Sequence, residues 1–198
     1  MTQFIEFSLF SKVRMRTFVG IPVKLPPELS KSVSHWKSVY EGEALRWVSP
    51  EKLHLTLRFF GEIQEDEIAE LKKHFYTSYK GSPKSCLSMD MLGFFGRRQS
   101  PRVLWSGFAS SEPVQELYTK TLVLERYIHP VMDTATYSPH ITLARIGRKG
   151  ISGKFREEIE SHRQQYWGQM ELSSVVLYES VITQKGARYN RIEEVALD

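Results

Sequence analysis

One tetrapeptide occurs twice in this sequence and limits the folds that the chain can adopt. His54-Leu55-Thr56-Leu57 and His140-Ile141-Thr142-Leu143 both read His-apolar-Thr-Leu, and the second copy begins 86 residues after the first (positions 54 and 140). Chance predicts about 0.01 copies of the full pattern in a chain of this composition. Two copies therefore predict two equivalent halves, each carrying one motif.

Both copies stand in runs that are typical of β-strands, where successive side chains point to opposite faces. The histidine and threonine of each copy then share one face, and the two apolar residues share the other. The apolar faces can pack into a core, whereas the polar faces can line a cleft. Two such strands side by side, related by a pseudo-twofold axis, bring two imidazoles and two hydroxyls together.

This set of groups suits general acid–base chemistry on a phosphodiester. The ordinary pKa of imidazole is near 6.5, so one ring can be neutral while the other is cationic at physiological pH. Threonine hydroxyls can donate hydrogen bonds to phosphate oxygens. Two competing interpretations are a pair of core histidines and a metal site, but the chain has no His-x-x-x-His pair and only one cysteine, Cys86. We expect neither a metal nor a cofactor.

The composition is that of a globular protein. The 198 residues, 41% of them hydrophobic and 25% charged, can bury a core without disulfides. No apolar run approaches the ~20 residues that a membrane helix needs. The net charge of +4 permits a polyanionic partner. A single cysteine and the absence of signal-peptide features favour a reducing cytoplasm.

Residues 1–14 are interpreted as an N-terminal extension, because strand-like alternation begins at Met15, and residues 15–198 as a single bilobal domain. Short strands interleave with helices, which predicts an α+β fold rather than a doubly wound parallel sheet. Periodicity predicts helices at 65–79, 113–127 and 153–166, and strands at 53–60, 85–95, 102–108, 141–146, 172–182 and 191–197.

Beyond the two motifs, the sequence resembles the two-histidine phosphoesterases, and within them the LigT-like RNA 2′,3′-cyclic phosphodiesterases, historically called 2′-5′ RNA ligases. The resemblance runs from Met15 to about Leu197. It is carried by both motifs and by residues 15–21, 46–51, 59–62, 101–107, 138–145 and 177–180, with Gly186 and Tyr189.

The resemblance implies a bilobal pseudo-twofold fold with antiparallel sheets lining a central V-shaped cleft and helices outside. It also implies metal-independent hydrolysis of a 2′,3′-cyclic phosphate RNA end to a 2′-phosphate, with reversible 2′-5′ RNA ligase activity. His54 is then the proton donor and His140 the proton acceptor, while Thr56 and Thr142 hold the phosphate. The implied partner is an RNA end, such as that of a tRNA fragment, and we expect a monomer that contacts no membrane.

Arginines near both motifs are further candidates for phosphate binding. Arg145 matches a family position, but strict alternation puts it on the core face of its strand. It can reach the phosphate only if the strand twists or ends near Ala144. Arg58 shares the face of His54 by alternation, without support from the resemblance.

Basic and aromatic residues outside the motifs could contact the rest of an RNA. Arg97 and Arg98 stand in a loop, and basic loops bind phosphates mainly through charge. Phe59 and Phe60 could stack on a base. Alternation points Phe60 outward, whereas the resemblance favours Phe59, so both stay candidates.

Two alternative functions stay open at this point. The same chemistry could act on ADP-ribose cyclic phosphate or on 2′-5′-linked oligonucleotides. The chain could instead be a non-catalytic RNA-binding protein on the same scaffold, although both motifs are intact. Turnover of these substrates, compared with that of an RNA end, discriminates between the alternatives.

Overall fold

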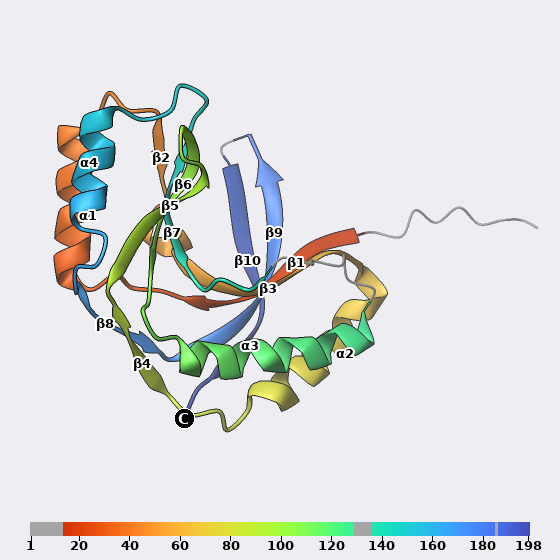
Figure 1. Ribbon diagram of the computed structural model, residues 1–198. Coiled ribbons are helices and arrows are strands. Elements are labelled where there is room, and N and C mark those ends of the chain that lie inside the picture. Colours follow the sequence, from red (N-terminus) through yellow and green to blue (C-terminus); the bar gives the residue numbers. More distant parts are fainter. Residues whose placement is uncertain (1–13, 129–135, 185) are drawn as a thin grey trace, which may run out of the picture.

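An antiparallel sheet of eight strands forms the centre of the computed structural model, which describes residues 14–128, 136–184 and 186–198 (Figure 1). The strand order is β10-β9-β1-β3-β7-β6-β5, and β2 pairs with β7. A smaller sheet contains β4 and β8. The strands are β1 (Arg14–Pro22), β2 (Leu45–Trp47), β3 (His54–Gln64), β4 (Ser85–Met89), β5 (Met91–Arg97), β6 (Ser100–Gly107), β7 (Ile141–Ile146), β8 (Gly168–Leu172), β9 (Ser174–Thr183) and β10 (Gly186–Ala196).

Two pairs of helices flank the sheets (Figure 1). Helices α1 and α4 lie side by side, and the indole Nε1 of Trp36 donates a hydrogen bond from α1 to Glu158 on α4 (3.2 Å). Helices α2 and α3 form the other pair, and the Tyr79 hydroxyl donates from α2 to the Leu117 carbonyl on α3 (3.0 Å). The helices are α1 (Pro27–Val39), α2 (Glu65–Tyr79), α3 (Glu112–Leu124) and α4 (Gly153–Ser161), with short 3₁₀ turns η1 (Pro50–Lys52) and η2 (Glu125–Tyr127).

The two motif strands meet at their motifs. Strands β3 and β7 are antiparallel, and their one register pair joins Leu55 to Ile141, the middle residues of the two His-apolar-Thr triplets. A pseudo-twofold axis between these residues relates the motifs. The pair β1-β3 on one side then corresponds to β6-β7 on the other. This arrangement confirms the predicted α+β fold with two halves.

The apolar faces of both motifs lie in one core. Leu55, Leu57, Ile141 and Leu143 are each at most 2% exposed, and they belong to a single cluster of buried side chains that runs through both halves. Burial of this kind contributes about 25 cal/mol per Å² of apolar surface. The core therefore holds the motif strands from behind and leaves their polar faces available.

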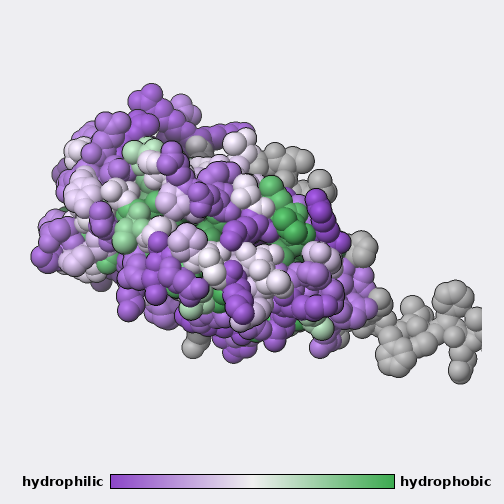
Figure 2. Space-filling model, turned by 90° about the horizontal axis from the view of Figure 1, so that it is seen from below, coloured by the Kyte–Doolittle hydropathy of each residue, from purple (hydrophilic) through white to green (hydrophobic). Residues whose placement is uncertain are grey.

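The solvent-exposed surface of helices α2 and α3 is mostly polar. Figure 2 views the molecule from this side and shows hydrophilic side chains with separate hydrophobic patches between them. Tyr76, Leu122 and Val123 are the large apolar residues of these helices that are exposed. In the described part of the chain, no helix is long and apolar enough to cross a membrane.

Several predicted boundaries were wrong. Residues 85–95 form two strands in different sheets, because the chain turns at Asp90, whose carboxylate accepts a hydrogen bond from the backbone N–H of Ala109 (2.7 Å). Helix α4 ends at Ser161, not at residue 166, and β10 begins at Gly186, not at residue 191. Arg14, assigned to the extension, already belongs to β1, whereas residues 1–13 lie outside the described residues.

Candidate active site

The two motif histidines are held in the same way. Nδ1 of His54 donates to the carbonyl oxygen of Lys52 (2.7 Å), and Nδ1 of His140 donates to that of Ser138 (2.8 Å). A carbonyl oxygen only accepts, so each Nδ1 carries the hydrogen in the neutral ring. In both neutral rings Nε2 is therefore the nitrogen that carries no hydrogen. The two equivalent hydrogen bonds follow the same pseudo-twofold relation as the motifs.

The environment lowers the pKa of both histidines. Burial is the largest cause for His54 and for His140, because it disfavours the charged ring. The positive charge of Arg145 lowers the pKa of both rings further, and that of His140 also lowers the pKa of His54. The carbonyl bonds act in the opposite direction. The two rings and the guanidinium are thus close enough to influence one another.

A β-bulge in the second motif brings Arg145 to the polar face of β7. Thr142 and Ala144 pair with consecutive residues of β6, so Leu143 between them is an extra residue. A bulge shifts the alternation of side chains by one position. Arg145 is consequently exposed rather than buried with Leu143. The local change of strand geometry on which the prediction for Arg145 depended is therefore present.

The first motif contains the equivalent bulge at Leu57, since Thr56 and Arg58 pair with consecutive residues of β1. A second bulge follows at Phe60. The prediction that Phe60 points outward was wrong: its side chain is fully buried in the core, because the bulges reverse the alternation. Phe59 is half-buried instead and packs with the aromatic residues near His54, which leaves it as the stacking candidate.

Aromatic rings surround both histidines. The ring of His54 lies 5.0 Å from those of Phe18 and Tyr189, between centroids, and 6.4 Å from that of Tyr178. The ring of His140 is nearly perpendicular to that of Phe95, with 4.6 Å between the ring centroids. The sequence analysis includes Phe18 and Tyr189 among the residues that carry the family resemblance, but it does not place either of them beside a histidine.

A hollow of about 210 Å³ beside His140 joins the two motifs. Tyr137 lines it, stacks on Tyr118 (4.0 Å between ring centroids) and donates a hydrogen bond to the Thr56 carbonyl (3.2 Å). Tyr137 thereby connects the segment before the second motif to the backbone of the first motif. The other lining residues are Thr56, Leu57, Arg58, Phe59, Tyr118, Thr136, Ser138 and His140.

Arg58 also lines this hollow, but its charge is neutralised within the protein. Its Nε donates to Glu125 (2.6 Å), and Nη1 donates weakly to the Tyr118 hydroxyl (3.5 Å). The Arg58 side chain is only 10% exposed. Its ion pair connects β3 to η2, and its hydrogen bond connects β3 to α3.

Arg97 and Arg98 are not among the residues that line the hollow beside His140. They line a different hollow, between the β5–β6 hairpin and α4. His54 and Thr56 stand on β3, His140 directly precedes β7, and Thr142 and Arg145 stand on β7. Arg97 and Arg98 instead stand at the end of β5, the edge strand of the sheet.

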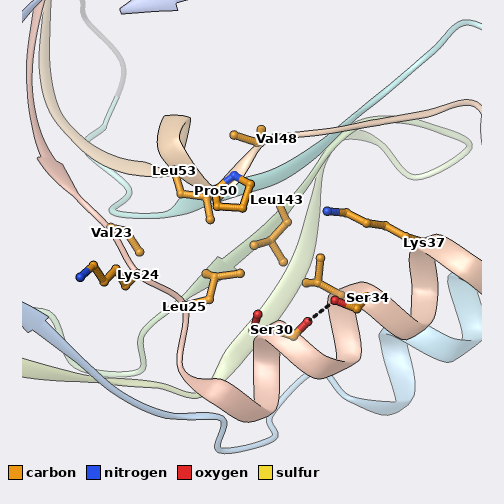
Figure 3. Close-up of a pocket in the computed structure, with 11 residues that line it drawn as sticks. Val23, Lys24, Leu25, Ser30, Ser34, Lys37, Val48, Pro50, Leu53 and Leu143 are labelled. Carbon is orange, nitrogen blue, oxygen red and sulfur yellow. Dashed lines mark hydrogen bonds between the residues drawn. The ribbon is translucent and has the colours of Figure 1, made fainter.

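A further hollow lies behind the motif strands, against α1 (Figure 3). Leu53 and Leu143, which face the core, form part of its wall, and Ser34 on α1 donates to the Ser30 carbonyl beside it (2.9 Å). This hollow is on the apolar side of the strands and is separate from the imidazoles.

Comparisons with known proteins agree with this arrangement. The family of LigT-like phosphoesterases matches residues 19–105. The RNA 2′,3′-cyclic phosphodiesterase of Thermotoga maritima is 34% identical over 132 residues, which is 67% of this chain and 70% of the relative. That of Methanocaldococcus jannaschii is 24% identical over 183 residues, covering 91% of this chain and 99% of the relative.

The fold is also that of a solved structure, E. coli LigT complexed with 3′-AMP. The TM-score is 0.70 at 24% identity, covering 93% of this chain and 99% of the other. The family match, the similarity to the T. maritima relative and the paired histidine motifs lead to one assignment. The chain belongs to the LigT-like branch of the two-histidine phosphoesterases.

Proposed function

We propose that this protein hydrolyses 2′,3′-cyclic phosphate ends of RNA to 2′-phosphates. The observation that carries the proposal is the matched pair of imidazoles on adjacent strands, each with Nδ1 bound to a carbonyl and Nε2 left to exchange protons. The relatives from T. maritima and M. jannaschii, named RNA 2′,3′-cyclic phosphodiesterases, support the substrate. The 3′-AMP bound to E. coli LigT is consistent with a nucleotide site in this fold.

In the proposed reaction, Nε2 of His140 accepts a proton from water while the water oxygen bonds to phosphorus. The bond between phosphorus and the 3′ oxygen breaks, and protonated Nε2 of His54 donates its proton to that oxygen. The products are a 2′-phosphate and a 3′-hydroxyl. His140 ends cationic and His54 neutral, and exchange with solvent restores both.

The remaining motif residues stabilise the phosphate. Hydroxyls of Thr56 and Thr142 donate to the non-bridging oxygens, and the Arg145 guanidinium offsets the charge that develops there. If a 5′-hydroxyl of RNA replaces water, the same proton transfers form a 2′-5′ bond. This is the ligase activity of the proposal.

In this proposal the protein acts as a monomer in the cytoplasm. Both motifs stand in one chain, which supports a monomer, since no partner residue is needed to pair the histidines. A single cysteine is consistent with a reducing cytoplasm. Fragments of tRNA that end in a 2′,3′-cyclic phosphate are suitable substrates.

The first test incubates the protein with a short RNA ending in a 2′,3′-cyclic phosphate. We expect a 2′-phosphate product and an unchanged rate in EDTA. His54→Ala and His140→Ala should each lower kcat by about 10²–10⁴-fold, which is the usual contribution of one proton-transfer group. Full activity in either folded variant, or a 3′-phosphate product, contradicts the mechanism.

A substrate with sulfur in place of the 3′ oxygen separates the two roles. A thiolate leaves without protonation, because a thiol has a pKa near 8.5, far below that of an alcohol. We expect this substrate to restore the rate of His54→Ala but not that of His140→Ala. Restoration of His140→Ala instead reverses the assignment of acid and base.

A further inference from the structure

A hollow rich in arginine lies at the β5 edge of the main sheet and is separate from the hollow beside His140. It measures about 540 Å³ and lies between the β5–β6 hairpin and α4. Arg97 and Arg98 line it from the hairpin, and Arg156 and Arg163 line it from α4 and the turn that follows. We call this cavity the arginine hollow.

The arginine hollow concentrates positive charge that no ion pair neutralises among the described residues. Within the residues that the structure describes, none of its four arginines forms an ion pair, and Glu160 is the one acidic residue in its lining. Charges of one sign in a concave surface focus the field and attract oppositely charged ligands. The composition therefore fits a polyanion.

The geometry of the hollow is built by the fold. The carbonyl oxygen of Arg163 accepts a hydrogen bond from the backbone N–H of Leu92 (3.0 Å), which fixes the turn after α4 against β5. The guanidinium of Arg156 lies 5.7 Å from the centre of the Phe94 ring. An aromatic face combined with basic groups is typical of surfaces that bind single-stranded nucleic acid.

Two aromatic rings link the lining of the hollow to His140. Trp105 lines the hollow and stacks on Phe95 at 5.1 Å, and Phe95 contacts His140 at 4.6 Å. Trp105 on β6 pairs with Thr142 of the second motif, and Phe95 stands on β5, the last strand of the sheet, so these contacts lead from the motif strand to the sheet edge. Gly93 leaves the space that the indole fills, since a Cβ there would lie 2.5 Å from Trp105.

We propose that the arginine hollow binds the phosphodiester backbone of the RNA strand that leads to the 2′,3′-cyclic end. The strand passes over Phe95 and Trp105 and places upstream phosphates among the four arginines. This inference rests on the proposed function and extends it: the enzyme distinguishes an RNA chain from a mononucleotide with the same cyclic phosphate.

The test compares 2′,3′-cyclic AMP with a ten-nucleotide RNA that carries the same end. Two variants remove opposite walls of the hollow: Arg97→Gln/Arg98→Gln and Arg156→Gln/Arg163→Gln. Each should raise KM for the RNA about tenfold and leave both parameters for 2′,3′-cyclic AMP unchanged. The salt dependence of log KM should become shallower by about 1.4, as expected for two lost phosphate contacts on a single strand.

The matched control is Lys149→Gln/Lys154→Gln, which removes two charges from exposed positions near α4 that do not line the hollow. An effect of the control equal to that of the arginine variants shows dependence on net charge alone and overturns the proposal. Equal losses on both substrates, or an effect of the hairpin pair only, also overturn it.

Binding to the inactive His140→Ala protein separates this proposal from the proposed function. Fluorescence anisotropy with the ten-nucleotide RNA should show weaker binding when either arginine pair is replaced. If wild-type protein turns over neither substrate, the proposed function fails, yet loss of RNA binding in the arginine variants still supports the hollow. If a polyglutamate peptide competes as well as the RNA, the hollow is a site for acidic protein segments and the RNA assignment is wrong.

Discussion

The decisive feature at the residue scale is the pairing of each histidine with a carbonyl two positions earlier. Such a bond joins residues only two positions apart, so the local sequence is sufficient to form it at both His54 and His140. It selects the tautomer in which Nδ1 carries the hydrogen and Nε2 of the neutral ring carries none. In contrast, some charged groups that shift the pKa of a ring come from distant parts of the chain, as Arg145 does for His54.

The pH dependence of activity should reveal how the surroundings of the two histidines shift their pKa values. Both histidine pKa values lie below 6.5, chiefly through burial, and kcat/KM reflects the acid and base of the free enzyme. Its maximum should therefore lie below pH 6.5. In Arg145→Gln a positive charge that disfavours protonation is gone, so both pKa values rise and the maximum moves to higher pH. Arg148→Gln, in the following turn, is the control, and an equal shift there contradicts this electrostatic explanation.

Tyr137 should act as a positioning residue. Tyr137→Phe removes the hydrogen bond to the Thr56 carbonyl and keeps the stacking on Tyr118. We expect a loss of about 0.5–1.5 kcal/mol of unfolding free energy and a lower kcat with KM little changed, because the first motif is less firmly held. Urea unfolding and steady-state kinetics measure the two effects. A variant with wild-type kcat contradicts the positioning role.

At the scale of elements, bulges decide which residues meet. Leu57 and Leu143 follow the threonine in each motif and are extra residues in their strands, which moves Arg145 to the polar face and Phe60 into the core. Cross-strand pairing creates a bulge, and two strands that are distant in sequence are needed to define it. Simple alternation along one strand therefore failed at these positions.

The ion pair between Arg58 and Glu125 should stabilise the contact between β3 and η2. Its partners are 10% and 21% exposed, so Arg58→Met leaves a poorly solvated carboxylate and should cost about 3–5 kcal/mol. The double variant Arg58→Met/Glu125→Met should recover most of that loss. Denaturant unfolding measures both.

An exposed pair provides the comparison for this prediction. Lys72 and Glu193 form an ion pair at 3.1 Å between α2 and β10, with side chains 41% and 31% exposed. Lys72→Met should therefore cost no more than about 1 kcal/mol. Similar costs for Arg58→Met and Lys72→Met would show that the Arg58 pair has no special role.

At the scale of the molecule, one core joins the two halves even though β3 and β7 share a single register pair. We expect both halves to unfold together. All four tryptophans, Trp36, Trp47, Trp105 and Trp167, lie in the half that contains α1, α4 and the β5–β6 hairpin, whereas far-UV circular dichroism records helices of both halves.

Urea transitions followed by tryptophan fluorescence and by circular dichroism should therefore coincide. Chains longer than about 150 residues often unfold through intermediates, so this outcome is not automatic. A fluorescence midpoint that differs from the circular dichroism midpoint contradicts a single cooperative core and shows that the halves are independent units.

Local patterns in the sequence determined much of this protein. The repeated motif predicted two related halves with both histidines on one polar face, and helical periodicity gave α2 with its bounds, because these features depend on neighbouring residues only. The roles of the site residues in catalysis and RNA binding stay predictions that the experiments above address.

Tertiary structure alone decided the rest. It created the bulges that bury Phe60 and leave Phe59 half-buried, and it paired Arg58 with Glu125. It also placed Arg97 and Arg98 in a hollow different from the one beside His140. Each of these depends on strand register or on a contact between residues far apart in the chain. Such contacts arise when the whole core packs, and no periodicity within a single segment encodes them.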